Sequence, residues 1–464
     1  MAERKRIYLC LAHMSEEGIE QKYIKEAFDT NWVVPLGPNV NGFEEDLEAF
    51  VNPTSTLPSR QGDKRVVALS SGTAAIHLAL IGCGVGPGDE VIVQSFTFCA
   101  SSHPVTYLGA TPVFVDSERE TWNMDPDLLE FAIKDRIAKT GKKPKAIIPV
   151  ALYGMPYRID EIMAIADRYE IPVIEDAAEG FGSRYNGQML GTFGRYGALS
   201  FNGNKMITTS GGGALICGPT SEQDGWGGAD TIMWYATQAR ESYPYYQHEK
   251  IGYNYRMSNI CAGIGRGQMT VANKHIEHHK HVQSLYEELL ADVPGITVHS
   301  QPNSNVNAND DVDRKYDSNY WLCTITLAPE LRIKGQENAY KSVIKSAVGG
   351  AAGVIHKAET ATTDCQPNDN VEALRVYLDQ AGIEARPVWK PMHCQPVYRQ
   401  GVVKMENIRT KDEDIVCQTS DSSVAYINGI SEDIFKIGMC LPAGPYVSDD
   451  DVRYIVEKIR EAID

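Results

Sequence analysis

Residues 146–176 read AIIPVALYGMPYRIDEIMAIADRYEIPVIED, and this stretch decides the class of fold. It contains two short runs rich in Ile and Val, Ala146–Val150 and Pro172–Glu175, which are typical of buried strands. Between them, apolar side chains recur at helical spacing over residues 160–169. The order strand, helix, strand predicts a crossover unit whose two strands lie parallel in one sheet.

The same alternation continues outward, from about Val66 to Cys217. Two more apolar runs predict strands at Val91–Gln94 and Pro112–Val115. Amphipathic stretches predict helices near residues 73–82, 99–108 and 125–139. Repeated crossover units predict an α/β fold with a mainly parallel sheet, and ligands of such sheets bind outside the carboxyl ends of the strands. Functional residues are therefore expected just after the strands.

The length of 464 residues exceeds what one hydrophobic core usually supports. After Tyr255 a long helical pattern over residues 258–292 predicts a bridge to a second domain. We therefore predict a large domain at residues 1–270 and a smaller C-terminal α+β domain at residues 271–464. Two polar stretches interrupt the second half: residues 301–319 predict an exposed loop, whereas residues 348–370 fit either a loop or an extra helix.

Composition excludes several classes of function. The formal net charge of -17 opposes contact with a nucleic-acid backbone, which requires a basic face. No window offers the roughly 18 consecutive apolar residues of a membrane span, so no membrane partner is expected. The ten cysteines include no CxxC pair, which gives no indication of a metal site and predicts reduced thiols in the cytoplasm.

Three stretches carry residues suited to chemistry, and the first is SSGTAAIHL at residues 70–78. It joins an apolar run to a helix, with Ser and Thr placed to cap the helix and Gly72 allowing a close backbone approach. The N–H groups and the positive end of the helix would converge on a phosphate-sized anion. Taken alone, an ordinary helix cap explains the same residues.

The second stretch is IEDAAEG at residues 174–180, where acids follow the end of a predicted strand. Asp176 at that position could hold a protonated ring nitrogen of a ligand. An Asp that caps the next helix is the alternative explanation.

The third stretch is LSFNGNKMITTSGGG at residues 199–213. A lysine in a tight, partly desolvated turn loses its proton more readily than one in water, as imine formation with an aldehyde requires. Lys205 is the only lysine of the stretch and is the candidate. The alternative is a Gly-rich hairpin that carries a solvent-exposed lysine.

An anion site, a carboxylate and an imine-forming lysine are together the protein groups that pyridoxal 5'-phosphate (PLP) requires. With these motifs the sequence resembles the DegT/DnrJ/StrS-type nucleotide-sugar aminotransferases, which have PLP fold type I (aspartate aminotransferase-like). Within that family, SFNGNK at residues 200–205 and RPVWKPMH at residues 386–393 resemble the branch that acts on UDP-4-keto-6-deoxy-N-acetylhexosamines.

The resemblance implies the roles of the cofactor-binding residues. Lys205 would form the imine with PLP and move protons between cofactor and substrate, and Asp176 would pair with the pyridinium nitrogen. Phe98 would stack on the ring. The phosphate would be bound by Gly72, Thr73, Ala74 and Ser200. Many relatives carry His where this chain has Glu179, so the role of this residue in cofactor binding is left open.

The resemblance also implies a homodimer with shared active sites, because the family supplies an Asn from the second subunit to the phosphate. GYNYRM at residues 252–257 matches that motif and makes Asn254 the candidate. The residues expected to contact the nucleotide-sugar substrate are Arg256, Trp389, Lys390 and His393.

The implied reaction moves an amino group from an amino acid, with glutamate as the expected donor, to a nucleotide-linked keto-sugar. One alternative is a PLP-dependent sugar dehydratase, although relatives of that kind replace the lysine by His. The other alternative is a non-catalytic sensor of PLP or of sugar nucleotides on the same fold. The presence of both Lys205 and Asp176 argues against the sensor.

Overall fold

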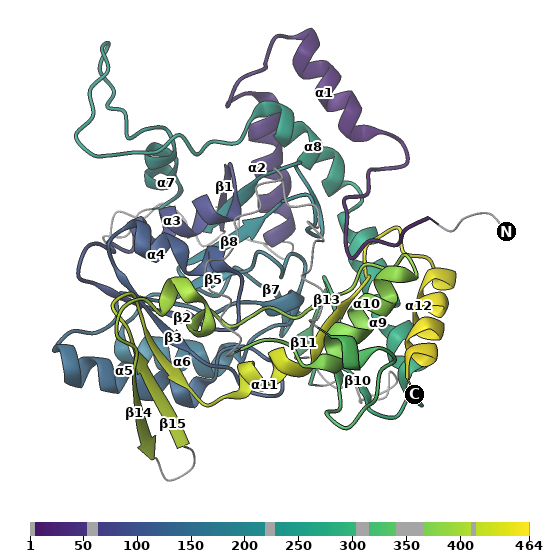
Figure 1. Ribbon diagram of the computed structural model, residues 1–464. Coiled ribbons are helices and arrows are strands. Elements are labelled where there is room, and N and C mark those ends of the chain that lie inside the picture. Colours follow the sequence, from purple (N-terminus) through teal and green to yellow (C-terminus); the bar gives the residue numbers. More distant parts are fainter. Residues whose placement is uncertain are drawn as a thin grey trace.

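The computed structural model describes residues 5–52, 64–218, 228–302, 315–339, 365–409 and 414–463 (Figure 1). Its centre consists of two groups of hydrogen-bonded strands. The first group has the order β1 (Arg65–Leu69), β9 (Gly213–Cys217), β8 (Tyr196–Ser200), β5 (Ile174–Asp176). The second has the order β14 (Lys404–Arg409), β15 (Asp414–Thr419), β16 (Val424–Ile427), β3 (Thr111–Val115), β2 (Glu90–Gln94), β4 (Ala146–Ile148). Parallel bridges between Ile147 and Val173 and between Val150 and Asp176 link β4 to β5.

Successive side chains of these strands enter two different cores, because side chains alternate between the two faces of a sheet. In β1, Val66 belongs to one apolar cluster and Val67 to the other. The cluster with Val67 includes residues of α3 (Gly72–Gly82) and α7 (Ala229–Ala236). The cluster with Val66 includes residues of α2 (Pro38–Val51), α5 (Pro126–Thr140) and α6 (Ile159–Tyr169). Helices therefore cover both faces, as the alternating pattern predicts.

The predicted strands at residues 91–94, 112–115, 146–150 and 172–175 correspond to β2, β3, β4 and β5. The helix predicted near residues 99–108 is divided into a 3-10 turn, Cys99–Ser101, and α4 (His103–Tyr107). The long pattern at 258–292 is likewise two helices, α8 (Asn259–Met269) and α9 (Ala272–Leu290). Three glycines of α8 allow close packing, since a Cβ at Gly267 would lie 2.6 Å from the backbone nitrogen of Glu20, which belongs to α1 (Ile19–Asp29).

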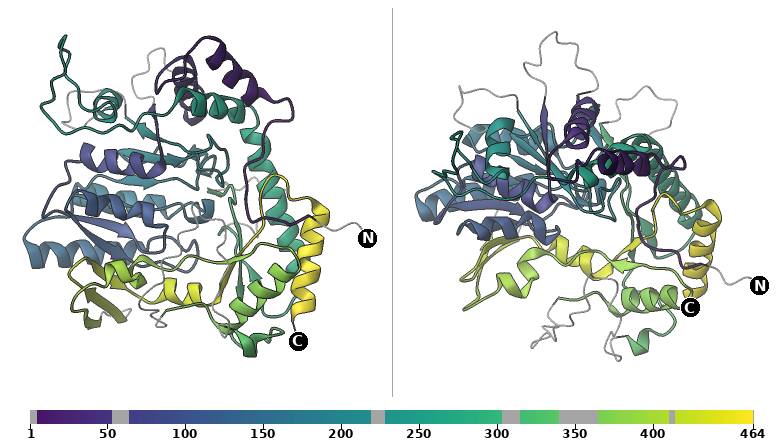
Figure 2. Two further views of the ribbon diagram at one scale, coloured as in Figure 1. Left: turned by 45° about the horizontal axis from the view of Figure 1, so that its top comes forward. Right: turned by 90° about the horizontal axis from the view of Figure 1, so that it is seen from above.

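A third core forms the C-terminal part of the molecule, where α9, α10 and α12 pack beside a small sheet (Figure 2). Besides α9, this core contains the helices α10 (Asp369–Gln380) and α12 (Asp449–Ala462). Its strands have the order β10 (Ile296–Val298), β12 (Cys323–Leu327), β17 (Gly438–Leu441), β13 (Arg386–Pro387). The start of the chain joins this core through a bridge between Ile7 and Ile383.

Sheet pairing crosses the predicted domain boundary at residue 270. Strand β16 pairs in parallel with β3, so the hairpin β14–β15 and β16 extend the large sheet although they come from the C-terminal half. Residue Ile7 is in contact with the small core instead. The division into residues 1–270 and 271–464 stays a prediction, and contacts at both ends of the chain cross it.

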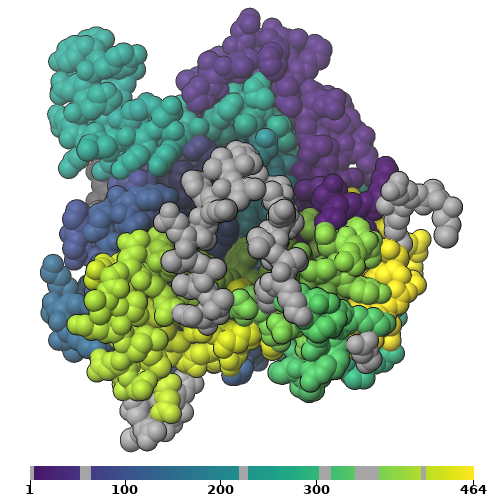
Figure 3. All heavy atoms as spheres, viewed as in Figure 1, coloured from purple at the N-terminus to yellow at the C-terminus, as the bar shows by residue number. Residues whose placement is uncertain are grey.

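The remaining elements lie at the edges. Residues 184–189 form the hairpin β6 (Arg184–Tyr185) and β7 (Gln188–Met189), which pairs with β11 (Tyr316–Asp317). Helix α11 (Ile430–Ile437) precedes β17. The segment after α7 projects from the body in the space-filling view and exposes Tyr245 and Tyr246 (Figure 3). Most of the stretches 301–319 and 348–370 lies outside the described residues. The described end of the first is not an exposed loop, because Tyr316–Asp317 form β11 and both Ser318 and Asn319 are buried. The described end of the second leads into α10. Within the described part, no helix has the length and apolar character needed to cross a membrane.

Candidate active site

A cavity of about 360 Å³ opens where β1, β5 and β8 end. The three strands run in the same direction, since β5 and β8 pair in parallel and β9 pairs antiparallel with both β8 and β1. Each strand is followed by residues that line the cavity. These are Ser70, Ser71, Gly72 and Thr73 after β1, Asp176 at the end of β5 with Ala178 and Glu179 after it, and Ser200 at the end of β8 with Asn202, Asn204 and Lys205 after it. The cavity therefore lies at the carboxyl ends of the strands, as predicted.

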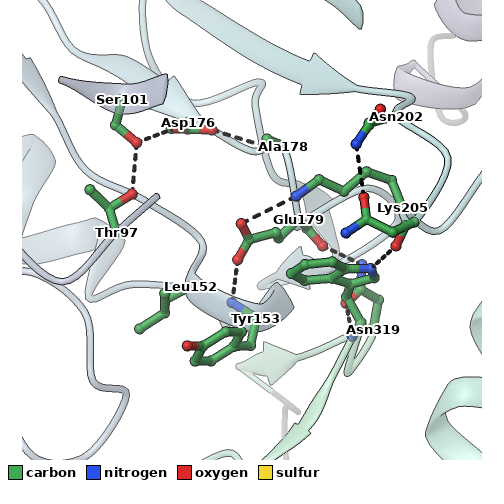
Figure 4. Close-up of polar contacts among 12 residues, drawn as sticks. Thr97, Ser101, Leu152, Tyr153, Asp176, Ala178, Glu179, Asn202, Lys205 and Asn319 are labelled. Atoms are coloured by element: carbon green, nitrogen blue, oxygen red, sulfur yellow. Dashed lines mark hydrogen bonds and ion pairs between the residues drawn. The ribbon is translucent and has the colours of Figure 1, made fainter. Parts of the chain in front are cut away.

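Lys205 extends into this cavity from the turn after β8, and its Nζ lies 3.3 Å from Oε1 of Glu179 (Figure 4). The two side chains are 12% and 4% exposed. On another side, Nζ lies 4.0 Å from the ring centroid of Trp321, which is close enough for a cation–π interaction. The amine is therefore held by an acid and an aromatic ring in a site that largely excludes water.

Glu179 is itself fixed by the protein. Its Oε2 accepts a 2.7 Å hydrogen bond from the backbone N–H of Tyr153, a residue with a φ of 54° that L-residues rarely adopt. The Nδ2 of Asn319 donates to the backbone oxygen of Glu179 at 2.8 Å. Burial raises the pKa of Glu179 to about 7, and the positive charge of Lys205 opposes that rise. Glu179 can thus give or take a proton near neutral pH, within reach of the lysine.

Asp176, the last residue of β5, lies at another side of the cavity and is hydrogen-bonded to two donors. Ser101 Oγ donates to Oδ2 at 2.5 Å, and the backbone N–H of Ala178 donates to Oδ1 at 3.1 Å. Ser101 Oγ also lies 2.7 Å from Thr97 Oγ1. Burial raises the pKa of Asp176, while these hydrogen bonds and the charge of Lys205 oppose the shift. The carboxylate is oriented by neutral donors and retains the capacity to pair with a cation.

The N-terminus of α3 forms the anion-binding side of the cavity. Ser71 caps the helix, with its Oγ accepting a 3.0 Å hydrogen bond from the N–H of Ala74. A Cβ added at Gly213 would lie 2.4 Å from the nitrogen of Gly72, so β9 packs directly against the start of the helix. Gly72, Thr73 and Ser200, the residues predicted to bind the phosphate, line the cavity. Ala74 is not among the lining residues, and its N–H is used by the cap.

Aromatic rings form one wall of the cavity, next to Lys205. Phe98 and Trp389 line the cavity, with ring centroids 5.4 Å apart, and Trp321 lies 6.2 Å from Trp389. Tyr153 supports this wall from behind, because its hydroxyl accepts a 2.8 Å hydrogen bond from the N–H of Trp389. Trp321 is held by a 2.6 Å hydrogen bond from its Nε1 to the backbone oxygen of Asn204. The wall offers apolar faces next to the reactive lysine.

Two predicted residues of the same chain, on the segment that follows α7, are not among the residues that line the cavity. Asn254 is exposed and forms a bridge with Thr237. Arg256 pairs with Leu69 at the end of β1, and its Nε is buried without a hydrogen-bond partner among the described residues. Neither residue is among those that line the cavity of its own chain.

Lys390 and His393 also lie outside the lining, although they follow Trp389 directly. Lys390 is half-buried. His393 is 1% exposed, with Nδ1 lying 2.6 Å from Ser95 Oγ and Nε2 lying 3.1 Å from Glu432 Oε1. Direct contact of these two residues with the substrate stays a prediction, and the buried position of His393 does not support it.

The structure adds four residues that sequence reasoning missed: Ser101, Tyr153, Asn319 and Trp321. Trp321 lies two residues after the polar stretch 301–319 and two before strand β12, so an aromatic residue at a loop-to-strand junction was a usable signal. No local pattern marks the other three, since each acts on Asp176 or Glu179 through a tertiary contact.

An α/β fold with a buried lysine, a carboxylate and a helix N-terminus around one cavity defines the PLP-dependent class. Residues 14–351 match the model of the DegT/DnrJ/EryC1/StrS aminotransferase family. EpsN of Bacillus subtilis, assigned as a pyridoxal phosphate-dependent aminotransferase, is 39% identical over 98% of this chain and 95% of its own length. GDP-perosamine synthase of Escherichia coli O157:H7 is 30% identical over 98% of both chains.

A solved structure, a DegT DnrJ EryC1 StrS aminotransferase from Brucella abortus, superposes with a TM-score of 0.72 at 25% identity, covering 96% of this chain and 95% of its own. The chain belongs to the DegT/DnrJ/EryC1/StrS aminotransferase family, and its fold is PLP fold type I. It is accordingly a PLP-dependent sugar aminotransferase.

Proposed function

We propose that this enzyme transfers an amino group from an amino acid, with glutamate as the donor, to the ketone of UDP-4-keto-6-deoxy-N-acetylhexosamine. The observation that carries the proposed chemistry is the convergence of Lys205, Asp176 and the start of α3 on one cavity. The choice of sugar rests on the motifs at residues 200–205 and 386–393. A GDP-linked sugar is the competing substrate, because one relative is a GDP-perosamine synthase.

The residues present fit both the phosphate group and the ring nitrogen of PLP. Gly72, Thr73 and Ser200 would hold the phosphate, and the close packing of Gly213 against Gly72 keeps side chains out of that position. Asp176 would face the ring nitrogen. When bound, PLP supplies an electron sink that stabilises negative charge on the substrate carbon.

Lys205 moves the proton at the reacting carbon, because it is the only cationic side chain among the described residues that line the cavity. Glu179, 3.3 Å from Nζ, orients the amine and holds a proton when the lysine gives one up. Its pKa of about 7 matches that task near neutral pH. Tyr153 and Asn319 keep Glu179 in place through the two backbone contacts described above.

Trp321 and Trp389 exclude water from the reacting groups and offer flat apolar faces against which a sugar ring can pack. Ionised groups near Lys205 then interact more strongly than they would in bulk water. The aromatic wall thus serves both binding and chemistry.

We propose further that the active unit is a homodimer in which Asn254 of one chain serves the phosphate site of the other. Asn254 is exposed and lies outside its own cavity, as an inter-subunit contact requires. Arg256, with its unpartnered buried Nε, is proposed to act on the substrate from the same segment.

The test is a panel of UDP-, GDP- and dTDP-linked sugars with 4-keto or 3-keto groups, each incubated with glutamate and analysed by mass spectrometry. The amine of a UDP-4-keto-6-deoxy-N-acetylhexosamine is the expected product, and Lys205→Ala serves as the inactive control. A product that has lost a hydroxyl without gaining nitrogen would indicate the dehydratase. A cofactor absorbance that glutamate leaves unchanged would indicate the sensor. Preferred amination of a GDP-linked sugar would replace the proposed substrate.

A further inference from the structure

Three buried or half-buried metal-binding side chains meet outside the cofactor cavity. They are Cys365, which precedes α10, Cys394, at the end of the turn Met392–Cys394, and Glu432, in the first turn of α11. The two Sγ atoms and a carboxylate oxygen all lie within 4.8 Å of one another. No CxxC pair marks these cysteines in the sequence, and the fold alone brings them together.

The surroundings of the three donors form an enclosed site. Each cysteine is 5% exposed, and the side chain of Glu432 is 28% exposed. His393 orients the carboxylate, because its Nε2 lies 3.1 Å from Glu432 Oε1 while its Nδ1 contacts Ser95 Oγ at 2.6 Å. An outer hydrogen bond of this kind commonly fixes a carboxylate that binds a metal.

The donor set fits zinc. Two thiolates select soft or borderline metals, and zinc also accepts a carboxylate oxygen. Zn–S and Zn–O bond lengths place neighbouring donors of a tetrahedral site about 3.3–3.8 Å apart, so the donors would move by about 1 Å or less to enclose the ion. A disulfide between the two thiols is the rival use, but it leaves Glu432 without a role in the cluster and requires an oxidant.

We propose that Cys365, Cys394 and Glu432 bind one zinc ion, with a water molecule as the fourth ligand. His393 is then a positioning residue for Glu432. The ion joins three segments that are distant in sequence, including the segment that carries Trp389 to the cavity wall. Met392 on the same segment donates its N–H to the oxygen of Ser95 at 2.8 Å, so the site anchors this wall without taking part in the chemistry.

Zinc content tests the site directly. Holoenzyme purified from zinc-supplemented medium without chelator is expected to contain one zinc per chain by mass spectrometry of the elements. Cys365→Ser and Cys394→Ser are expected to lower that content at least tenfold. Cys261→Ser is the control, because it removes a half-buried thiol of α8 that is not part of this cluster. This variant is expected to keep the zinc.

Cobalt substitution covers the case in which a serine variant fails to fold. Wild-type protein dialysed against Co²⁺ is expected to show a thiolate-to-cobalt charge-transfer band in the near ultraviolet, and Glu432→Gln, checked for folding by circular dichroism, is expected to bind Co²⁺ at least tenfold more weakly. Wild-type protein without bound zinc and without that band would overturn the proposal. So would a disulfide between residues 365 and 394 found in the protein as purified.

Discussion

Lys205 Nζ and Glu179 Oε1 lie 3.3 Å apart, in a site where both side chains are almost fully buried. The amine that must exchange protons during catalysis is thus next to a carboxyl group whose pKa burial raises to about 7. Proton exchange is most efficient when the partner titrates near the working pH. In the proposed function, Glu179 therefore has a specific use, because it exchanges a proton with Lys205.

Glu179→Gln removes the titrating group but keeps a side chain of similar size. We expect single-turnover conversion of the bound cofactor by glutamate to slow roughly 100-fold, the lower range for a lost acid–base group. We also expect the change in this rate with pH near 7 to disappear, because the titration of Glu179 causes it. Stopped-flow absorbance from pH 5.5 to 8.5 measures both effects, and the exposed Glu170→Gln is the control. If the rate of Glu179→Gln still changes with pH near 7, another group causes that pH dependence.

Asp176→Asn tests the carboxylate that would face the ring nitrogen. Asn keeps one acceptor oxygen for the N–H of Ala178, and its NH2 group can donate to the hydroxyl of Ser101, which is also able to accept, so cofactor binding should survive. The loss of charge removes the stabilisation of a protonated ring, and we expect proton transfer to slow about tenfold or more, the equivalent of one pKa unit. The measurement is single-turnover conversion by glutamate in the PLP-loaded variant. Near-normal speed would reduce Asp176 to a structural role in the turn after β5, where no helix begins and where it contacts Ser101 and Ala178.

Gly213→Ala tests the packing of the sheet against the phosphate-binding helix. The added Cβ would lie 2.4 Å from the nitrogen of Gly72, so β9 or α3 must shift. We expect a loss of about 1–3 kcal/mol in stability, as for other overpacked sites, together with weaker PLP binding. Gly86→Ala is the control, because a Cβ there meets nothing within 4 Å. Thermal denaturation measures the stability of both variants, and titration with PLP measures their affinity for the cofactor. Equal stability and equal affinity of the two variants would show that this contact does not shape the cavity.

Local sequence signals located the parts of the site that follow strand ends. Asp176 stands at the end of an apolar run, and Lys205 lies in the polar, Gly-containing turn that follows another, so position and residue type together made them the candidates. Trp321 reaches the cavity only because the C-terminal part of the chain packs against the large sheet, and local periodicity carries no information on such packing. Tyr153 acts from outside the lining, through a tertiary contact of its backbone N–H with Glu179. The same limit explains His393: its motif suggested contact with the substrate, whereas tertiary contacts place its ring between Ser95 and Glu432.

The shared-site model predicts complementation between two inactive variants. Lys205→Ala and Asn254→Ala are mixed, unfolded gently and reassembled. If Asn254 serves the other chain, each hybrid has one intact site, so about a quarter of wild-type activity should return, since about half of the dimers are hybrids. Size-exclusion chromatography with differently tagged chains verifies hybrid formation. Hybrids without activity would place Asn254 in the site of its own chain or outside both sites.

Glu44 on α2 predicts a pH dependence of stability that is separate from catalysis. Its Oε1 accepts a 2.9 Å hydrogen bond from the N–H of Ala68, and burial raises its pKa from 4.5 to about 7, with Arg256 opposing the shift. A carboxyl group with a raised pKa in the folded state contributes stability that is full below pH 4.5 and is lost as the pH rises through 7.

The Gln side chain of Glu44→Gln does not titrate. The Tm of this variant should therefore rise relative to that of the wild type as the pH increases from 5 to 8. Glu45→Gln, its exposed neighbour on the same helix, should keep a constant difference from the wild type. Thermal denaturation of the three proteins at pH 5, 6, 7 and 8 measures these differences. If the Tm of Glu44→Gln instead falls relative to that of the wild type as the pH rises, the ionised Glu44 stabilises the fold. Its attraction to Arg256 then outweighs the cost of burying its charge.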